Sequence, residues 1–482
     1  MDFFYRFRSI DALLGSWKEL EKQEIYFARP DQLNDPMEGF TDLVWFGDKI
    51  AWTNLIKHYL VSLQLAVSAA LLTGDDYSEA KFPINVFASA STLPTVKARE
   101  IHRNICVDLF KDPDVAALPE LLAMRRRRIR REELEFYLRA IHCGSLHAVL
   151  KVFRTEGLLP GNSCPLRPPE PMAAVARQVL NTVNSREPDD DRDTGNHFFA
   201  AASKQFRQTE LKNYLVAKGP TERLWQLIAV GFPDRYINYL RQLVYSDWYV
   251  ASFVANPNDA AMWGIYGSRH TGVCLKFRAT KGDDGAPHLR LRQIVEWGFG
   301  PNGVRQNYGK RLHRFERISY VDKFPEIDFF RYIGRIQAQA LRRDWYRDEN
   351  GVASSCADEI LSNADERRRR YWETFQATVT AKLRDWEHEG EYRLILNDAM
   401  RCFCDPADRT FVYEFDDLAG IIFGINTTLE DRMSISNVLL EKCRSSGRSD
   451  FEFAQAYYAP QTGKIETCSF NLLNSEPGLA ML

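Results

Sequence analysis

The sequence predicts an α+β fold, in which a mixed sheet domain is built from both ends of the chain around a large helical insertion. Segments with strand character occur near the N-terminus and again after residue 246, whereas residues 49–245 carry apolar residues mainly at helical spacing. The 482 residues are 45% hydrophobic, enough for a large core and more than one domain. We therefore expect one α+β domain made of 1–48 and 246–482, and a mainly helical unit made of 49–245.

The N-terminal segment predicts a strand, a helix and a second strand, followed by a loop. FFYRFRSI has strand character, DALLGSWKELEKQ has helical character with a capping residue at its start, and the strand EIYFARP ends at Pro30. DQLNDPMEG is expected to be a loop. Asn34 and Asp35 favour local side-chain-to-backbone hydrogen bonds, and Pro36 keeps Asp35 out of the helical region.

The insertion, residues 49–245, predicts helices interrupted by two loops. Its most apolar window, 59–72, carries no charge but is too short to cross a bilayer and includes Ser and Gln. A buried helix is expected there, and no membrane partner. The Pro-rich stretch 160–171 and the acidic stretch 184–196 predict loops.

Strand character returns after the insertion. WYVASFV (248–254) and GVCLKFRA (272–279) predict strands with a short helix between them, and a loop is expected around EWGFGPNGVRQNYGKR (296–311). Later strands are expected at 317–324, 391–396, 410–415, 420–426 and in FEFAQAYYA, and helices in DFFRYIGRIQAQALRRDWYRDEN, ADERRRRYWETFQATVTAKLR and TLEDRMSISNVLLEKC.

Charge and cysteine content predict a cytoplasmic protein without a metal site. Lys and Arg number 63 against 65 Asp and Glu, so the net charge of -2 gives no chain-wide attraction to polyanions. The N-terminus lacks the pattern of a secretory signal, and nine thinly spread cysteines fit reduced thiols in a cytosol. Cys402 and Cys404 form a C-x-C, but no second pair with ligand spacing accompanies them.

Several segments, taken together, resemble the bacterial domain-of-unknown-function family 2971. These segments come from both ends of the chain: YRFRS (5–9), YFARPDQLNDPME (26–38), NDAAMWGIYGSRHTGVCLKF (258–277), KLRDWEHEGEYRLIL (382–396) and IIFGINTT. The resemblance implies a cytosolic bacterial protein in a family for which roles in phage defence are suspected. It brings no established reaction, and the insertion here exceeds what the family usually carries at that point.

The family's middle motif contains Trp263, Tyr266 and His270. Trp263 and Tyr266 are three residues apart, so on a helix they share a face, and His270 lies one turn further, near the helix exit. A Met-Trp-Tyr stripe at this spacing is more typical of a core than of a ligand-facing aromatic pair. His270 suits either the satisfaction of free carbonyl groups or a catalytic role. Cys274 is expected to be a buried, inert thiol.

The late motif places Glu391 and Arg393 on one face of a strand, because strand neighbours alternate. One interpretation is a solvated ion pair that contributes little stability. The other is a site for sugar or phosphate chemistry, in which the carboxylate holds a ribose hydroxyl and stabilises positive charge while the guanidinium binds a pyrophosphate.

The layout of these motifs also resembles ADP-ribosyltransferase folds that cleave NAD. That resemblance implies that Arg6 or Arg29 holds the dinucleotide, Tyr266 stacks on nicotinamide and Glu391 binds the ribose, although no Ser-Thr-Ser strand precedes Glu391. NAD would then be a substrate, and no cofactor is expected. The expected catalytic residues are Glu391, His270 and Tyr266, and the expected substrate-binding residues are Tyr5, Arg6, Arg29, Asn34, Asp35, Trp263 and Arg393.

An alternative function is non-catalytic binding of nucleic acid through two arginine runs. Arg125–Arg131 and Arg367–Arg370 are each expected in a helical stretch beside acidic residues, which favours a solvated face. Four consecutive arginines nevertheless wrap around a helix, so some are expected to point outward as a phosphate-binding patch.

Overall fold

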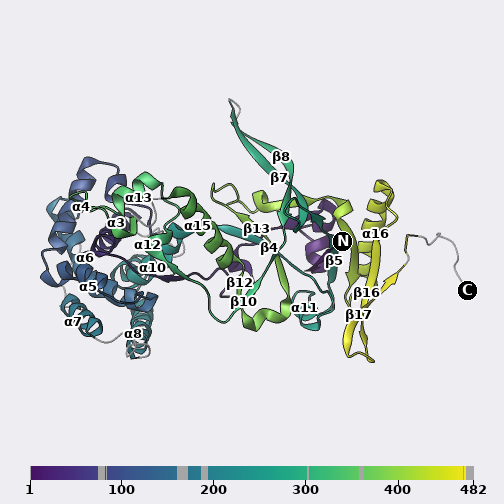
Figure 1. Ribbon diagram of the computed structural model, residues 1–482, viewed down its shortest axis with the longest axis horizontal. Coiled ribbons are helices and arrows are strands. Elements are labelled where there is room, and N and C mark those ends of the chain that lie inside the picture. The colour runs from purple at the N-terminus through teal and green to yellow at the C-terminus, as the bar shows by residue number, and fades with distance from the viewer. Residues whose placement is uncertain are drawn as a thin grey trace, which may run out of the picture. The chain divides into compact units, whose positions relative to one another are not determined.

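The fold was analysed in a computed structural model of the chain (Figure 1). The structure describes residues 2–73, 82, 84–159, 172–185, 194–300, 303–357, 363–470 and 472–473. The predicted loop at 160–171 lies outside the described residues, and only the ends of 184–196 lie within them.

The α+β fold class is confirmed, and the chain divides into two compact units. A sheet unit comprises 1–40, 247–324 and 376–482, and a helical unit comprises 41–246 and 325–375. The sequence placed residues 325–375 with the sheet domain, but in the structure they group with the helices. One reason is the parallel pairing of β11 (Glu326–Asp328) with β3 (Asp42–Val44) in the helical unit.

The main sheet of the sheet unit has eight strands in the order β17-β16-β15-β5-β1-β4-β13-β9. The N-terminal strand β1 (Phe3–Arg8) lies inside this sheet, antiparallel to β5 (Val273–Arg278) and β4 (Trp248–Val254). On its other side, β4 pairs with β13 (Glu391–Asn397). The remaining strands are β15 (Leu418–Phe423), β16 (Glu452–Ala459), β17 (Lys464–Phe470) and β9 (Glu316–Arg317).

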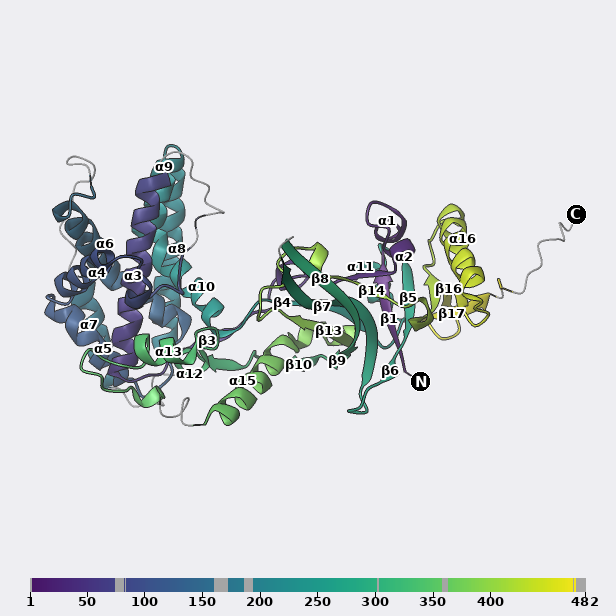
Figure 2. The same cartoon turned by 90° about the horizontal axis from the view of Figure 1, so that it is seen from above.

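A second sheet contains a long hairpin where the sequence predicted a loop at 296–311. β7 (Pro287–Gly300) pairs along its length with β8 (Gly303–Arg314), so the prediction was wrong (Figure 2). Leu289 and Leu291 of β7 are fully buried in the core of the unit, and this burial anchors the hairpin at its base. The other strands of this sheet are β2 (Glu24–Tyr26), β14 (Thr410–Tyr413) and β6 (Thr280–Lys281).

Short helices connect the strands of the sheet unit. The predicted helix after β1 is interrupted, because Gly15 ends α1 (Ile10–Leu14) and Lys18, in the left-handed region with a φ of 55°, precedes α2 (Glu19–Lys22). The other helices named below are α11 (Ala260–Ile265) and α16 (Leu429–Ser446). The strand β10 (Ser319–Val321) is parallel to β12 (Ala381–Leu383), which contains the first residues of the late motif.

The helical unit packs around α3 (Lys49–Thr73), which contains the predicted buried helix. In it, His58 stacks on Trp345 with ring centroids 3.9 Å apart, and the Asn54 amide donates to the Trp345 carbonyl at 2.8 Å. α3 is long and apolar enough to span a membrane by length and composition, but 67% of its apolar window is buried within the protein. The other helices are α4 (Val96–Leu109), α5 (Pro113–Ala123), α6 (Arg131–Thr155), α7 (Met172–Asn184), α8 (Thr194–Val216), α9 (Pro220–Gln226), α10 (Phe232–Val244), α12 (Phe329–Tyr332) and α13 (Ala338–Asp344), with α15 (Ala364–Val379) continuing into the sheet unit.

Candidate functional site

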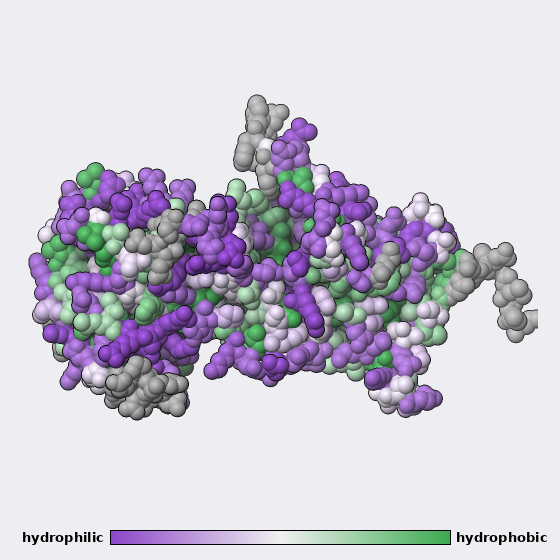
Figure 3. All heavy atoms as spheres, viewed as in Figure 1, coloured by the Kyte–Doolittle hydropathy of each residue, from purple (hydrophilic) through white to green (hydrophobic). Residues whose placement is uncertain are grey.

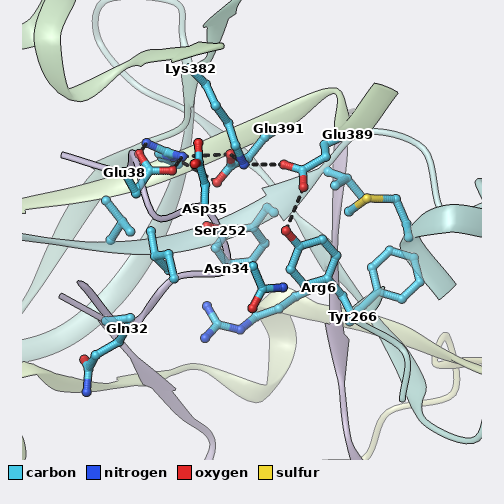
Figure 4. Close-up of a pocket in the computed structure, with 18 of the residues that line it drawn as sticks. Arg6, Gln32, Asn34, Asp35, Glu38, Ser252, Tyr266, Lys382, Glu389 and Glu391 are labelled. Carbon is cyan, nitrogen blue, oxygen red and sulfur yellow. Dashed lines mark hydrogen bonds and ion pairs between the residues drawn. The ribbon is translucent and has the colours of Figure 1, made fainter. Parts of the chain in front are cut away.

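A pocket of about 260 Å³, lined by charged and apolar side chains, lies in the sheet unit (Figure 4). Strand register explains how distant segments meet there, because Val254 pairs with Tyr5 on one side and with Glu391 on the other. Seven of the ten expected site residues line the pocket, together with residues that were not expected. The seven are Tyr5, Arg6, Asn34, Asp35, Tyr266, Glu391 and Arg393.

Arg29, Trp263 and His270 do not line this pocket. Arg29 is exposed and pairs with Asp31 at 3.2 Å. Trp263 is fully buried, and its indole donates to the Pro257 carbonyl at 2.7 Å, so it serves the core, as the helical stripe favoured.

His270 belongs to a turn with an uncommon backbone. Ser268, Arg269 and His270 have φ angles of 51°, 57° and 67°, three consecutive non-glycine residues in the left-handed region. The carbonyl of His270 accepts from the Asn426 amide at 2.9 Å, so the turn is held against the segment after β15. This turn, rather than a helix exit, determines where the His270 ring lies.

Arg393 is the centre of a buried ion-pair cluster at one end of the pocket. Its side chain is fully buried and donates to Glu38 at 2.6 and 2.7 Å and to Glu391 at 2.8 and 2.9 Å. It also donates to the Val379 carbonyl at 3.1 Å. The predicted Glu391–Arg393 pair is therefore present, but it is buried and shared with a second carboxylate rather than solvated.

The cluster continues from Glu391 to Tyr266. Lys382 Nζ donates to Glu391 at 3.1 Å and also to Glu389. The other oxygen of Glu389 accepts from the Tyr266 hydroxyl at 2.7 Å. Burial, together with the negative charges of Glu389 and Glu391, raises the pKa of Tyr266, so the phenol stays protonated and acts as a donor.

Glu391 is ionised despite its burial. Burial alone would raise its pKa, but the charges and hydrogen bonds of Arg393 and the charge of Lys382 outweigh that effect and lower the pKa to about 2. A general acid at neutral pH needs a raised pKa, so this carboxylate is suited to stabilising positive charge instead.

Low pH is expected to destabilise the sheet unit, because it protonates Glu391. The pKa of this carboxyl is lower in the folded state than in the unfolded chain, so its stabilisation is complete above an unfolded pKa of about 4.3 and is lost as pH falls toward 2. Hydrogen–deuterium exchange in β13 peptides should accelerate over this pH window after correction for intrinsic rates. Glu391→Gln should weaken that pH dependence; an unchanged profile would contradict this role.

Arg6 is the pocket cation that is left open to a ligand. It is 92% buried (8% exposed), its Nη2 donates to the Tyr26 carbonyl at 3.2 Å, and its Nη1 has no hydrogen-bond partner among the described residues. Burial and the charge of Arg8 lower its pKa to about 9, so it remains charged at neutral pH. In contrast, Arg8 pairs with Glu19.

Asp35 also presents a free polar atom in the pocket. Its Oδ1 accepts from the Met37 amide at 2.9 Å, as the expected loop geometry requires, while Oδ2 has no partner among the described residues. The side chain is 5% exposed. The pocket thus holds one buried cation and one buried carboxylate oxygen whose hydrogen-bonding capacity is unused.

Five residues that were not predicted also line the pocket: Glu38, Lys382, Glu389, Gln32 and Ser252. Glu38 is the acid that follows the Asn-Asp-Pro motif, and Lys382 opens the late motif. Because these two residues lie inside sequence motifs that had already been singled out, their positions were a usable signal.

The first arginine run is not helical, contrary to the prediction. Arg125–Arg130 precede α6, which begins at Arg131. Arg125 is buried against Glu133 at 3.0 Å, and Arg130 pairs with both Asp42 and Glu326. Much of its charge is therefore neutralised within the helical unit.

The second run, Arg367–Arg370, lies on α15 as predicted. Arg369 and Arg370 pair with Glu366 at 2.8 and 2.7 Å, and Arg367 donates to the Ile333 carbonyl at 3.1 Å. Like the first run, this segment carries its own counter-charge.

In the described part of the chain, no group of three or more His, Cys, Asp and Glu side chains is arranged to hold a metal ion.

Searches of protein-family models, curated proteins and solved structures found no match to this chain.

Proposed function

We propose that the pocket binds NAD or a related dinucleotide and that the protein cleaves the bond between nicotinamide and ribose, as ADP-ribosyltransferases and NAD glycohydrolases do. The observation that carries the proposal is the set of charged side chains that line the pocket. It offers the unpaired, charged Arg6 for a phosphate and, among its other groups, the ionised Glu391 for a ribose.

The proposed chemistry needs no proton from Glu391. The C1′–N bond breaks, its electron pair leaves on the nicotinamide nitrogen, and positive charge develops on the ribose. Water or an acceptor then attacks C1′ and loses a proton. With Glu38, Glu389, Glu391, Lys382 and Arg393 all charged, the cluster carries one net negative charge, which favours the cationic transition state.

The volume of the pocket also favours partial enclosure of the ligand. A volume of about 260 Å³ lies just below the roughly 300–1,000 Å³ typical of small-molecule pockets. We therefore place the nicotinamide riboside half inside, with the pyrophosphate at Arg6 and the adenosine half outside. The ring of Tyr266, next to Glu389, is the aromatic group assigned to nicotinamide.

NAD is expected to stabilise the protein against heat. A ligand present at 100 times its Kd adds about 2.7 kcal/mol to the free energy of unfolding. Arg6→Gln should weaken NAD binding by roughly 10- to 100-fold, because a charge-assisted hydrogen bond contributes about 1.5–3 kcal/mol. The measurements are melting temperature across an NAD titration and release of nicotinamide.

Arg29→Gln is the matched control, since Arg29 is exposed and paired with Asp31 outside the pocket. It should bind NAD as the unmodified protein does. The absence of any melting shift with NAD, NADP or mononucleotides, or equal effects of the two Arg substitutions, would refute the proposal.

A further inference from the structure

The β7–β8 hairpin is a strongly basic two-stranded ribbon. Its strands carry six Lys and Arg residues against a single acid, Glu296. The whole chain has a net charge of -2, so this concentration of positive charge is local. Figure 1 shows the hairpin extending away from the rest of the sheet unit, and Figure 3 shows hydrophilic residues near its outer described end. The six basic residues, all exposed, are Arg290, Arg292, Arg305, Lys310, Arg311 and Arg314.

Register separates the ribbon into a core face and a solvent face. Residues directly opposite each other in an antiparallel pair share a face, and alternate residues along a strand do as well. Leu291, which is fully buried, marks the core face. Arg292 is opposite Lys310, and Arg290 is opposite Leu312, so these residues mark the solvent face. Tyr308 and Arg314 follow the alternation of Lys310 onto the same face.

The positive charge of the solvent face is only partly neutralised by the protein. Arg292 lies over the Tyr308 ring at 5.5 Å and forms no ion pair with a carboxylate of the described chain. Lys310 pairs with Glu414 at 3.0 Å, and Arg314 pairs with Glu316 at 3.4 Å and with Asp284 at 3.6 Å. Both cations are about half exposed, and such surface pairs contribute little. In the first arginine run, by contrast, Arg125 is buried against Glu133.

We propose that the solvent face of the β7–β8 hairpin binds B-form DNA, with the ribbon lying in the major groove. Two paired strands lie about 4.8 Å apart, and the major groove, about 12 Å wide, admits a two-stranded ribbon. Four cations, Arg290, Arg292, Lys310 and Arg314, lie within about 13 Å along the strands, because the four residues from 310 to 314 advance about 3.3 Å each. The deep, narrow major groove of A-form RNA excludes side chains, so DNA is the expected duplex.

The test is fluorescence anisotropy with a labelled 20-base-pair DNA duplex between 50 and 200 mM salt. The variant Arg290→Gln, Arg292→Gln, Lys310→Gln should bind at least tenfold more weakly at 100 mM salt. Each lost phosphate contact lowers the slope of log K against log salt by about 0.9, so three lost contacts should reduce it by about 2.7. The variant Arg290→Lys, Arg292→Lys keeps the charge and should bind nearly as well as the unmodified protein.

Removing the same charge elsewhere provides the control. Arg368→Gln, Arg369→Gln, Arg370→Gln on α15 changes the net charge equally and should leave DNA binding unchanged. The proposal is overturned if both triple variants lose affinity equally, if single-stranded DNA or duplex RNA binds more tightly than duplex DNA, if anionic vesicles bind while DNA does not, or if none of these binds.

Discussion

Replacing Arg393 by Met is expected to lower the free energy of unfolding of the sheet unit by roughly 3–5 kcal/mol, the usual penalty for removing one partner of a buried ion pair. The guanidinium is fully buried between Glu38 and Glu391. Without it, Lys382 still faces Glu391, but Glu38 loses both short hydrogen bonds from Arg393 and has no substitute cation nearby in the described cluster.

Hydrogen–deuterium exchange of β13 peptides and thermal melting measure this loss. Arg317→Met is the matched control, because Arg317 lies on the neighbouring strand β9 and is exposed. Adding Glu38→Gln to the Arg393→Met variant should recover part of the stability, since a neutral amide leaves no uncompensated charge. A loss as small as that of Arg317→Met would mean that the cluster is well solvated.

Glu391→Gln is expected to reduce NAD cleavage by about 10²- to 10³-fold, the range found when an electrostatic contact to a transition state is removed. The amide has the shape of the carboxylate, and Arg393 keeps its two bonds to Glu38, so the fold and the binding of NAD should be largely retained. Nicotinamide release under single-turnover conditions, beside a melting curve, separates loss of catalysis from loss of fold.

Substitutions at two nearby glutamates serve as comparisons for the Glu391→Gln result. Glu387→Gln alters an exposed side chain and should leave the rate unchanged. Glu389→Gln weakens the links to Lys382 and Tyr266 and should have an intermediate effect. Equal, mild losses at all three positions would contradict a catalytic role for Glu391 while leaving its ion pair with Arg393 intact as a structural element.

Sequence could predict that seven of the expected residues share one pocket. Their charged and amide side chains lie in segments whose strand or loop character is clear from the sequence. β1, β4 and β13 are such strands, and the Asn34–Asp35 loop has clear turn chemistry. The sequence could not predict which side of α11 lies toward the pocket. Helical spacing shows which side chains share a face of the helix, but it does not show what that face contacts. Trp263 thus lies in the core and Tyr266 in the pocket.

The predictions from sequence were wrong where strand pairing between distant residues, rather than local composition, determines the structure. Residues 296–311 contain Gly, Asn and Pro, and their strand structure depends on pairing between β7 and β8 rather than on local preference. Likewise, residues 325–375 showed helical patterns, but only the pairing of β11 with β3 reveals that they group with the insertion. The left-handed turn at His270 had no sequence signal, because none of its three residues is glycine.

The central position of β1 has a consequence for synthesis on the ribosome. This strand emerges before its neighbours β4 and β5, which begin at Trp248 and Val273. At about 5–20 residues per second, β1 waits roughly 12–50 s for its partners. Glu391 emerges later still, after roughly 20–80 s. A nascent chain therefore carries no complete pocket until β13 has been translated, and a product truncated before β13 would keep Arg6, Asp35 and Glu38 but lack Glu391 and Arg393.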